Sequence, residues 1–448
     1  SNVDVVNDVV VDAAATRDLY TFAATAGVSA GFSLAGAAGI TIVGSTLSSE
    51  AKNELGSSTD SELDRFASKD RLSVGGNIDT NSNFTQSDID AINSAGKTST
   101  SSNLATSGLA PGTLAQRTKA QISGSASNHV QAGKNVLVHS SEKDKVAMQV
   151  GAVSIGVVAL GGSVGFLDIT NNVESEVSGA LSLTSTSGKI DVTSEVGRLD
   201  AAQSAASVQT LQGSGGVVGL GAAVSKVTVT NNIAATLARG TTAESLAGDI
   251  SVKATDSSDL NAEAIGLNVG LVGAGVTIAY ADKKGSTSAS LGDEAVTGAA
   301  THATLGSDTL RVQADRSGRV KAKATAGAGG ILSGSGADAR ATDGGLVQAL
   351  IGNSVEVDSS GGKVKVAATA TPQTDASALG INIGAGSVGA SLATARSNAT
   401  VVAKLGAGAD ITAAQLDVLA TRNIGAAPSA LAKATGASGG LLFGINAT

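Results

Sequence analysis

The chain contains no cysteine and no tryptophan, and only 3 of its 448 residues are proline. The missing cysteine excludes disulfide bonds and thiol chemistry. Aromatic residues make up 2% of the sequence, so we expect small aliphatic side chains in thin layers to fill the core. Charged residues are also scarce, at 15%, and a low charge with a positive mean hydropathy argues against intrinsic disorder.

The net charge of −8 disfavours binding to nucleic acid or to an anionic membrane surface, because like charges repel. The sequence does not begin with methionine and has no basic segment followed by an apolar one. We therefore expect a mature piece or a fragment of a longer protein.

Glycine is abundant, with 58 residues, and the chain repeats itself. A short strand with alternating apolar residues occurs as NVLVH, KIDVT, DISVK, TLRVQ, KVKVA and QLDVL. We call the first apolar residue of each copy a stripe residue: Val136, Ile190, Ile250, Leu310, Val364 and Leu416. They recur at intervals of 52 to 60 residues, with a small-residue and glycine motif shortly before most of them. Alternation of this kind predicts half-buried strands.

A recurring unit with several short strands predicts an all-β, right-handed parallel β-solenoid. A unit of 52 to 60 residues suits two coils of about 26 to 30 residues each, which gives some 13 or 14 coils and a rod of roughly 65 Å. The stripe residues should lie in register and point inward. The valines two positions later should do the same: Val192, Val252, Val312 and Val366.

Two units share a phrase that ends in paired asparagines, LDITNN at 167–172 and VTVTNN at 227–232. Asparagine tolerates left-handed backbone and caps its own chain, so the pairs predict a turn between strands. We interpret Asn171, Asn172, Asn231 and Asn232 as structural residues.

Glycine-rich runs at 150–167 and 264–281 have no charge and are long enough for a membrane helix. Their bulky residues alternate with glycine or asparagine, as in 265–271 and 379–384, and this period of two indicates strands. The flat glycine face favours close packing inside a narrow solenoid, or alternatively a lateral contact between rods. Missing aromatic girdles disfavour a transmembrane barrel.

Residues 45–119 depart from the repeat, which occupies 1–44 and 120–448. Thr59 and Glu62 form a capping box, which predicts a helix in a small helical or irregular inserted subdomain. Insertions carry function more often than scaffolds do, although an inert decoration is an equal alternative. The insert holds the candidate partner-binding residues Arg65, Phe66, Arg71 and Phe84.

Catalytic, metal-binding and cofactor-binding motifs are missing from the sequence. His129, His139 and His302 lie far apart in the repeat and are expected on the surface. The acidic clusters Asp60, Glu62, Asp64 and Asp293, Glu294 do not recur from unit to unit, so solvated charge is favoured over calcium binding. We predict no catalytic residues, no metal site and no cofactor.

The order of motifs VxVxA, AxA, GxGxxVG and VxVTNNxxAxI resembles the repeats of bacterial filamentous adhesins and haemagglutinin-like exoproteins, especially those of the leukotoxin type. The resemblance covers 1–44 and 120–448 and leaves out the insert. It implies a secreted, surface-displayed β-solenoid that mediates attachment or aggregation.

We therefore expect a non-enzymatic shaft segment of a bacterial surface adhesin or extracellular fibre, located outside the cell. Its partners would be a component of a host or neighbouring-cell surface or matrix, with lateral or end-to-end self-association and without nucleic acid or membrane insertion. The alternatives are a polysaccharide-degrading β-helix enzyme, which needs clustered acids and bases on one face, and part of a secreted cytotoxin or pore.

Overall fold

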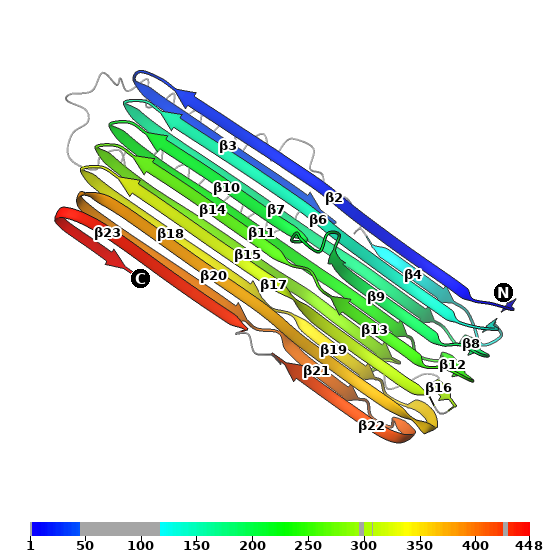
Figure 1. Ribbon diagram of the computed structural model, residues 1–448. Helices are drawn as coiled ribbons and strands as arrows, with labels where there is room; N and C mark the ends of the chain where they lie inside the picture. The colour runs from blue at the N-terminus through cyan, green and yellow to red at the C-terminus, as the bar shows by residue number, and fades with distance from the viewer. Residues whose placement is uncertain (1, 45–116, 295–299, 307, 424–428) are drawn as a thin grey trace. The chain divides into compact units, whose positions relative to one another are not determined.

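The computed structural model describes residues 2–44, 117–294, 300–306, 308–423 and 429–448. Within these ranges every regular element is a strand, and every strand pairing is parallel (Figure 1). The predicted parallel β-solenoid is therefore confirmed. Residues 1–43 and 117–448 form one compact unit, distinct from 44–116.

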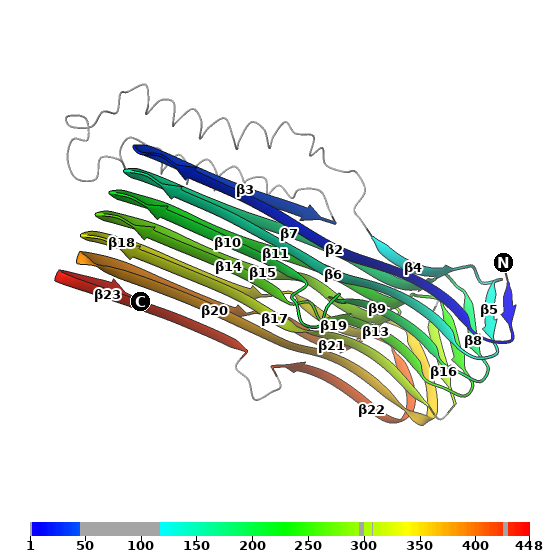
Figure 2. The same ribbon diagram turned by 45° about the horizontal axis from the view of Figure 1, so that its top comes forward.

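One coil shows the path of the chain. Strand β6 (Val136–Ile155) runs outward, and the chain reverses at 156–157, which we call the tip. Strand β7 (Val158–Ser178) returns, and the short strand β8 (Ser182–Ser185) closes the coil at the opposite end. The corresponding short strands of successive coils pair with one another, as β5, β8, β12 and β16 show (Figure 2).

The other strands repeat this path along the chain. They are β1 (Val3–Val5), β2 (Val9–Val28), β3 (Phe32–Val43), β4 (Thr118–Ser123), β5 (His129–Ala132), β9 (Ile190–Arg198), β10 (Ala206–Gly215), β11 (Val218–Leu237), β12 (Thr242–Ser245), β13 (Ile250–Asp256), β14 (Leu260–Val269), β15 (Val272–Leu291), β16 (Thr301–Leu305), β17 (Thr309–Gly329), β18 (Leu332–Asp343), β19 (Leu346–Ile351), β20 (Val355–Ser397), β21 (Thr400–Leu405), β22 (Asp410–Arg422) and β23 (Ala430–Ala447).

The stripe residues form one continuous column, as predicted. Val136 pairs with Ile190, and the column continues through Ile250, Leu310, Val364 and Leu416. The first five are fully buried, and so are Val192, Val252, Val312 and Val366. Leu416 is 44% exposed because it lies in the last described coil, where no further layer covers it.

The prediction of two coils per unit is wrong. Each stripe residue pairs directly with the stripe residue of the next unit, so one unit of 52 to 60 residues makes one coil. Counting from Val9, which pairs with Val136, the described residues form seven coils, numbered here 1 to 7. Seven coils extend over about 30 Å, half the predicted length, whereas a 20-residue strand extends over about 66 Å.

Two apolar clusters fill the space between the outgoing and returning strands. The first surrounds the stripe column and includes Ile190 and Leu237. The second lies farther along the strands toward the tip and includes Met148 and Leu167. Between them, the inward positions of coil 2 hold Ser140, Glu142 and Asp144 where apolar residues are expected. A polar zone thus divides the core.

In the glycine-rich runs, the strand face that carries glycine and asparagine points into the solenoid near the tip. In β14, Gly266 and Asn268 face inward, while Leu267 and Val269 are exposed. A Cβ on Gly275 of the returning strand would lie 1.8 Å from Nδ2 of Asn268, so the two layers are too close for larger side chains. Packing inside a narrow solenoid therefore explains the glycines of this inward face.

The insert interrupts coil 1 at a position that the register defines. Val43 pairs with Ile169 and Thr118 pairs with Val173, so residues 44–117 stand where coil 2 uses only residues 170–172. Thr118 and Lys119, placed in the insert by the sequence, belong to β4. The predicted helical or irregular structure of the insert lies outside the described residues.

Candidate functional site

The polar zone between the two apolar clusters forms a buried column that crosses several coils, and we call it the polar column. Outgoing strands contribute Arg17, Glu142, Asp144, Asp256 and Arg316, the segment between β13 and β14 contributes Ser258, and returning strands contribute Asn171, Asn231, Lys283 and Asp343. Each of these side chains that belongs to a strand sits at a position that the alternation turns inward. The column contains the largest group of buried charges among the described residues.

The asparagine pairs belong to this column, and the predicted turn is wrong. Asn171 lies inside β7 and pairs with Asn231 inside β11. Both are buried, and Nδ2 of Asn171 donates to Oδ1 of Asn231 at 3.0 Å. Asn172 and Asn232 point outward and make an equivalent hydrogen bond of 3.0 Å. Identical amides stacked in register form ladders of this kind in parallel sheets.

Arg17, Glu142 and Asp144 form the N-terminal part of the column. Arg17 makes an ion pair with Glu142, lies 3.5 Å from Oδ1 of Asp144, and donates to Oδ1 of Asn171 at 2.6 Å. Two carboxylates thus share one guanidinium in a buried place. Burial raises the pKa of the Glu142 carboxyl to about 7, against the opposing charge of Arg17 and with a contribution from Asp144. Burial also raises the pKa of Asp144.

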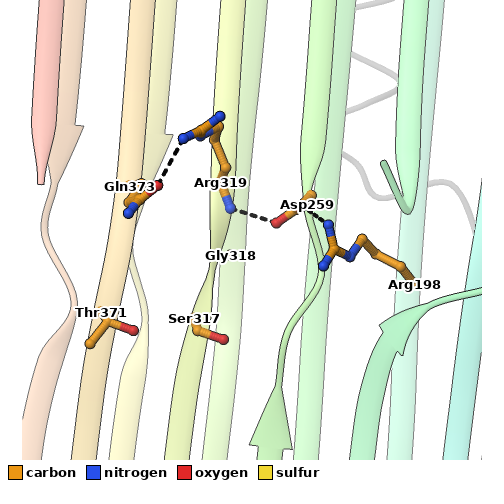
Figure 3. A pocket seen from close by; sticks show the side chains of 7 residues that line it. All are labelled: Arg198, Asp259, Ser317, Gly318, Arg319, Thr371 and Gln373. Atoms are coloured by element: carbon orange, nitrogen blue, oxygen red, sulfur yellow. Dashed lines mark hydrogen bonds and ion pairs between the residues drawn. The ribbon is translucent and has the colours of Figure 1, made fainter. Parts of the chain in front are cut away.

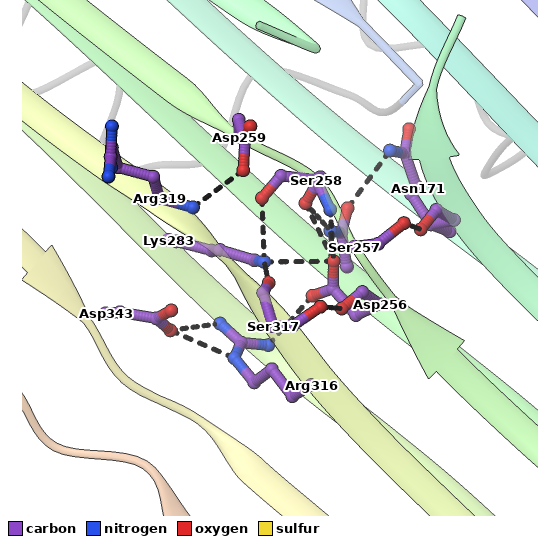
Figure 4. A network of polar contacts seen from close by, with 12 residues as sticks. Asn171, Asp256, Ser257, Ser258, Asp259, Lys283, Arg316, Ser317, Arg319 and Asp343 are labelled. Atoms are coloured by element: carbon purple, nitrogen blue, oxygen red, sulfur yellow. Dashed lines mark hydrogen bonds and ion pairs between the residues drawn. The ribbon is translucent and has the colours of Figure 1, made fainter. Parts of the chain in front are cut away.

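Asp256, Lys283, Arg316 and Asp343 form the C-terminal part, and all four side chains are fully buried (Figure 4). Oδ1 of Asp256 lies 3.0 Å from Nζ of Lys283, and its Oδ2 accepts from Arg316 at 3.2 Å. Arg316 also donates to Asp343 from Nε at 2.9 Å and from Nη2 at 2.8 Å. Two positive and two negative groups therefore balance.

Hydrogen bonds complete the environment of these buried charges. Lys283 donates to the carbonyl oxygens of Ser258 and Ser317 at 2.9 and 2.7 Å. Burial alone raises the pKa of Asp256, but Lys283, Arg316 and the hydrogen bonds from Ser258 more than offset this effect and leave it below its ordinary value. Because these side chains have no contact with solvent, the C-terminal part of the column can hold adjacent coils in register but offers no surface to a substrate.

The raised pKa of Glu142 predicts a pH-dependent stability. The folded state binds this proton more tightly than the unfolded chain, whose glutamate titrates near 4.5. The contribution to stability is therefore fully present below pH 4.5 and is lost as the pH rises through about 7. We expect a higher melting temperature at pH 6 than at pH 8. Glu142→Gln should add roughly 1 to 3 kcal/mol at pH 8 and reduce the pH dependence.

The matched control is Glu195→Gln on β9, whose side chain is 39% exposed. Thermal unfolding followed by circular dichroism at both pH values would measure the effect. An unchanged pH profile in Glu142→Gln would contradict the assignment.

A shallow hollow of about 350 Å³ lies on the outer surface near the polar column, lined by Arg198, Asp259, Ser317, Gly318, Arg319, Thr371 and Gln373 (Figure 3). Asp259 accepts hydrogen bonds from Nη1 of Arg198 and from the backbone nitrogen of Arg319, both at 2.6 Å. The side chain of Arg319 donates to Gln373 at 3.2 Å. The single carboxylate is thus held by two arginine donors and has no second acid or base beside it in the lining.

The three histidines lie on the surface, as predicted, with side chains 37% to 42% exposed. Each contacts a carboxylate of a neighbouring coil: His129 with Asp4, His139 with Asp12, and His302 with Glu356. Across the described ranges, no three histidine or acidic residues are grouped to hold a metal ion.

Asp293 and Glu294 are exposed and pair with Arg239 and Lys404, which agrees with the prediction of solvated charge. Asp60, Glu62, Asp64 and the candidates Arg65, Phe66, Arg71 and Phe84 lie outside the described residues. The structure places none of them.

Sequence reasoning missed the polar column, although a signal for it was present. Asp256 lies six positions after the stripe residue Ile250, and Arg316 lies six positions after Leu310. In a strand with a period of two, an even offset keeps the side chain on the inward face. Charged residues at even offsets from a buried stripe therefore indicate charges inside the core.

Comparison with models of known protein families gives no match for this chain. No curated protein and no solved structure matches it either. Searching the described residues for a helix long and apolar enough to cross a membrane finds none.

Proposed function

We propose that this chain is a non-enzymatic shaft segment of a bacterial surface adhesin or extracellular fibre that mediates attachment, aggregation or biofilm formation. The observation that carries the proposal is the stripe column, which continues through all seven coils from Val9 through Val136 to Leu416. Each coil commits its inward residues to stacking and its backbone to pairing with neighbours. Such a unit transmits force and spaces other elements apart.

Binding in this proposal belongs to the insert and stacking belongs to the coils. The register requires only three residues at the place where 44–117 stand, so the solenoid does not need the insert for its continuity. Arg65, Phe66, Arg71 and Phe84 supply the arginine and aromatic side chains that dominate binding energy at protein interfaces. The proposed partner is a component of a host or neighbouring-cell surface or matrix, met outside the bacterial cell.

A binding assay tests this function directly. We expect the immobilised chain to bind cells or extracellular matrix saturably. Incubation with pectin, alginate, hyaluronan or host glycans should release no new reducing or unsaturated ends. Sugar cleavage that disappears in Asp259→Asn would instead support the polysaccharide-degrading alternative, because Asp259 is the carboxylate in the outer hollow. Failure of the immobilised chain to bind either cells or extracellular matrix would count against the adhesin role.

A further inference from the structure

The outer face of the outgoing strands carries no charge near the tip and is largely aliphatic there. In coils 2, 4, 5, 6 and 7 the outgoing strand has a last charged residue, and no charge lies between that residue and the tip. In the order of the coils, these last charged residues are Lys145, Glu263, Lys323, Asp375 and Lys433. Strand β10 of coil 3 has no charged residue at all. Aliphatic side chains take their place on this face and are exposed to solvent. Soluble monomers rarely expose a contiguous apolar patch larger than a few hundred Å².

Bulky and small residues alternate on this face from coil 2 to coil 7, whereas coil 1, with Ala26 and Val28 at the same register positions, lies outside the alternation. Coils 2, 4 and 6 carry the ridge pairs Val153 with Ile155, Leu267 with Val269, and Ile381 with Ile383, each side chain between 40% and 66% exposed. Coils 3, 5 and 7 carry, at the same register positions, the groove pairs Gly213 with Gly215, Gly327 with Gly329, and Ala437 with Gly439. Ridges therefore recur about every 9.6 Å, with a groove between each two.

The fold of the chain itself does not demand glycine at the groove position nearest the tip. A Cβ at Gly215, Gly329 or Gly439 would meet no atom within 4 Å. None of the groove glycines has a positive φ. Inward glycines such as Gly221 differ, because a Cβ there would lie 1.8 Å from Nε2 of Gln212. Glycine weakens a strand, so its use at open outward positions indicates that something must approach the backbone closely.

We propose that a second copy of this chain packs on this face, with the ridges of each copy seated in the grooves of the other. A two-fold axis parallel to the strands brings the two stacks together in opposite directions and keeps both tips on the same side. Coil 2 then faces coil 7, coil 4 faces coil 5, and coil 6 faces coil 3. All three ridges of each copy meet a groove, as a closed, self-complementary interface requires.

Other arrangements fit the alternation less well. A two-fold axis along the stack would set each coil against its own copy, so ridge would meet ridge and groove would meet groove. A fluid lipid surface gains nothing from open glycine grooves, since an aliphatic residue in every coil would bury more apolar area. The face covers roughly 600 Å² per copy, about 29 Å along the stack by 20 Å along the strands, which is near the lower end of specific interfaces.

Cysteine cross-linking tests the register, because the chain has no native cysteine. In the proposed dimer, position 153 of one copy faces position 437 of the other. Val153→Cys combined with Ala437→Cys should therefore give an oxidised dimer in high yield, whereas either substitution alone should not. Within one copy the two positions are five coils apart, about 24 Å, which excludes an internal disulfide.

Filling the grooves tests the interface without cysteine. Gly215→Leu with Gly329→Leu should weaken dimerisation at least tenfold in sedimentation equilibrium while the monomer stays folded, because both sites are open. The control is Gly336→Leu on a returning strand, where the nearest atom to a new Cβ is 4.0 Å away, and it should leave dimerisation unchanged.

A native chain that stays monomeric at all concentrations would overturn the proposal, and so would cross-linking by Val153→Cys alone. Binding of the face to neutral phosphatidylcholine vesicles in place of dimerisation would also overturn it and would assign the face to a membrane. The inference stands apart from the adhesin proposal, since self-association and attachment are measured separately.

Discussion

Asp256→Ala should lower the free energy of unfolding by about 3 to 5 kcal/mol, because it leaves two buried cations with one buried anion. The side chains of Lys283 and Arg316 have no solvent exposure, so water cannot replace the lost carboxylate. Urea denaturation monitored by circular dichroism measures the loss. The matched control is Asp18→Ala, which removes a pair with Lys145 at 3.2 Å whose side chains are 57% and 30% exposed. An exposed pair of this kind contributes at most about 1 kcal/mol.

A second variant distinguishes the free-energy cost of an unpaired buried charge from the contribution of the whole network to the free energy of unfolding. Replacing Asp256, Lys283, Arg316 and Asp343 together with apolar residues leaves no charge without a partner. Other coils already have an apolar residue at this inward position. Val196 in coil 3 pairs with Asp256, and Ala370 in coil 6 pairs with Arg316. We expect the fourfold variant to lose less stability than Asp256→Ala alone. A loss greater than that of the single variant would show that the network stabilises the stack beyond its own charge balance.

Deletion of residues 44–117 should abolish attachment and leave the solenoid folded. The linker is set by the register: Val43 and Thr118 pair with Ile169 and Val173, so three residues complete the strand. Thr-Asn-Asn, copied from 170–172, continues the extended chain. An Asn-Gly linker would instead form a tight turn and bend the chain away from the strand direction. Binding to cells and the melting temperature are the two measurements.

The control for this deletion is the full chain carrying Arg65→Ala and Phe66→Ala, which should reduce binding without moving the melting temperature. Attachment that persists after the deletion would assign binding to the outer faces of the coils. Loss of the cooperative unfolding transition would show that the insert is required for folding.

The period of the repeat could be predicted from the sequence, and so could the inward column. Val136, Ile190 and Ile250 stand in register because each begins an alternating strand at the same place in its unit. The site of the insert could also be predicted, to within two residues at its C-terminal end. The number of coils could not be predicted, because the repeat gives the sequence separation of stacked residues but not how many coils the chain makes within one unit.

The polar column and the apolar face near the tip were missed for a common reason. Alternation shows that residues such as Asn171 and Thr170 face opposite ways, but it does not show which way is inward. In β14 the bulky side chains of Leu267 and Val269 point outward and Asn268 points inward, the reverse of the usual preference. The spacing between the two layers decides this reversal, and that spacing is a property of the folded coil.

The sequence by itself determined that this protein is a parallel stack of strands, because in-register repetition of alternating residues leaves each unit only its neighbours to pair with. Tertiary structure alone decided how wide each coil is and what its interior holds. Where the outgoing and returning strands lie far enough apart, aliphatic side chains fill the gap, as Met148 and Leu167 do. Near the tip the layers approach so closely that only small or polar groups such as Ser154 fit, and the bulky side chains are left facing solvent.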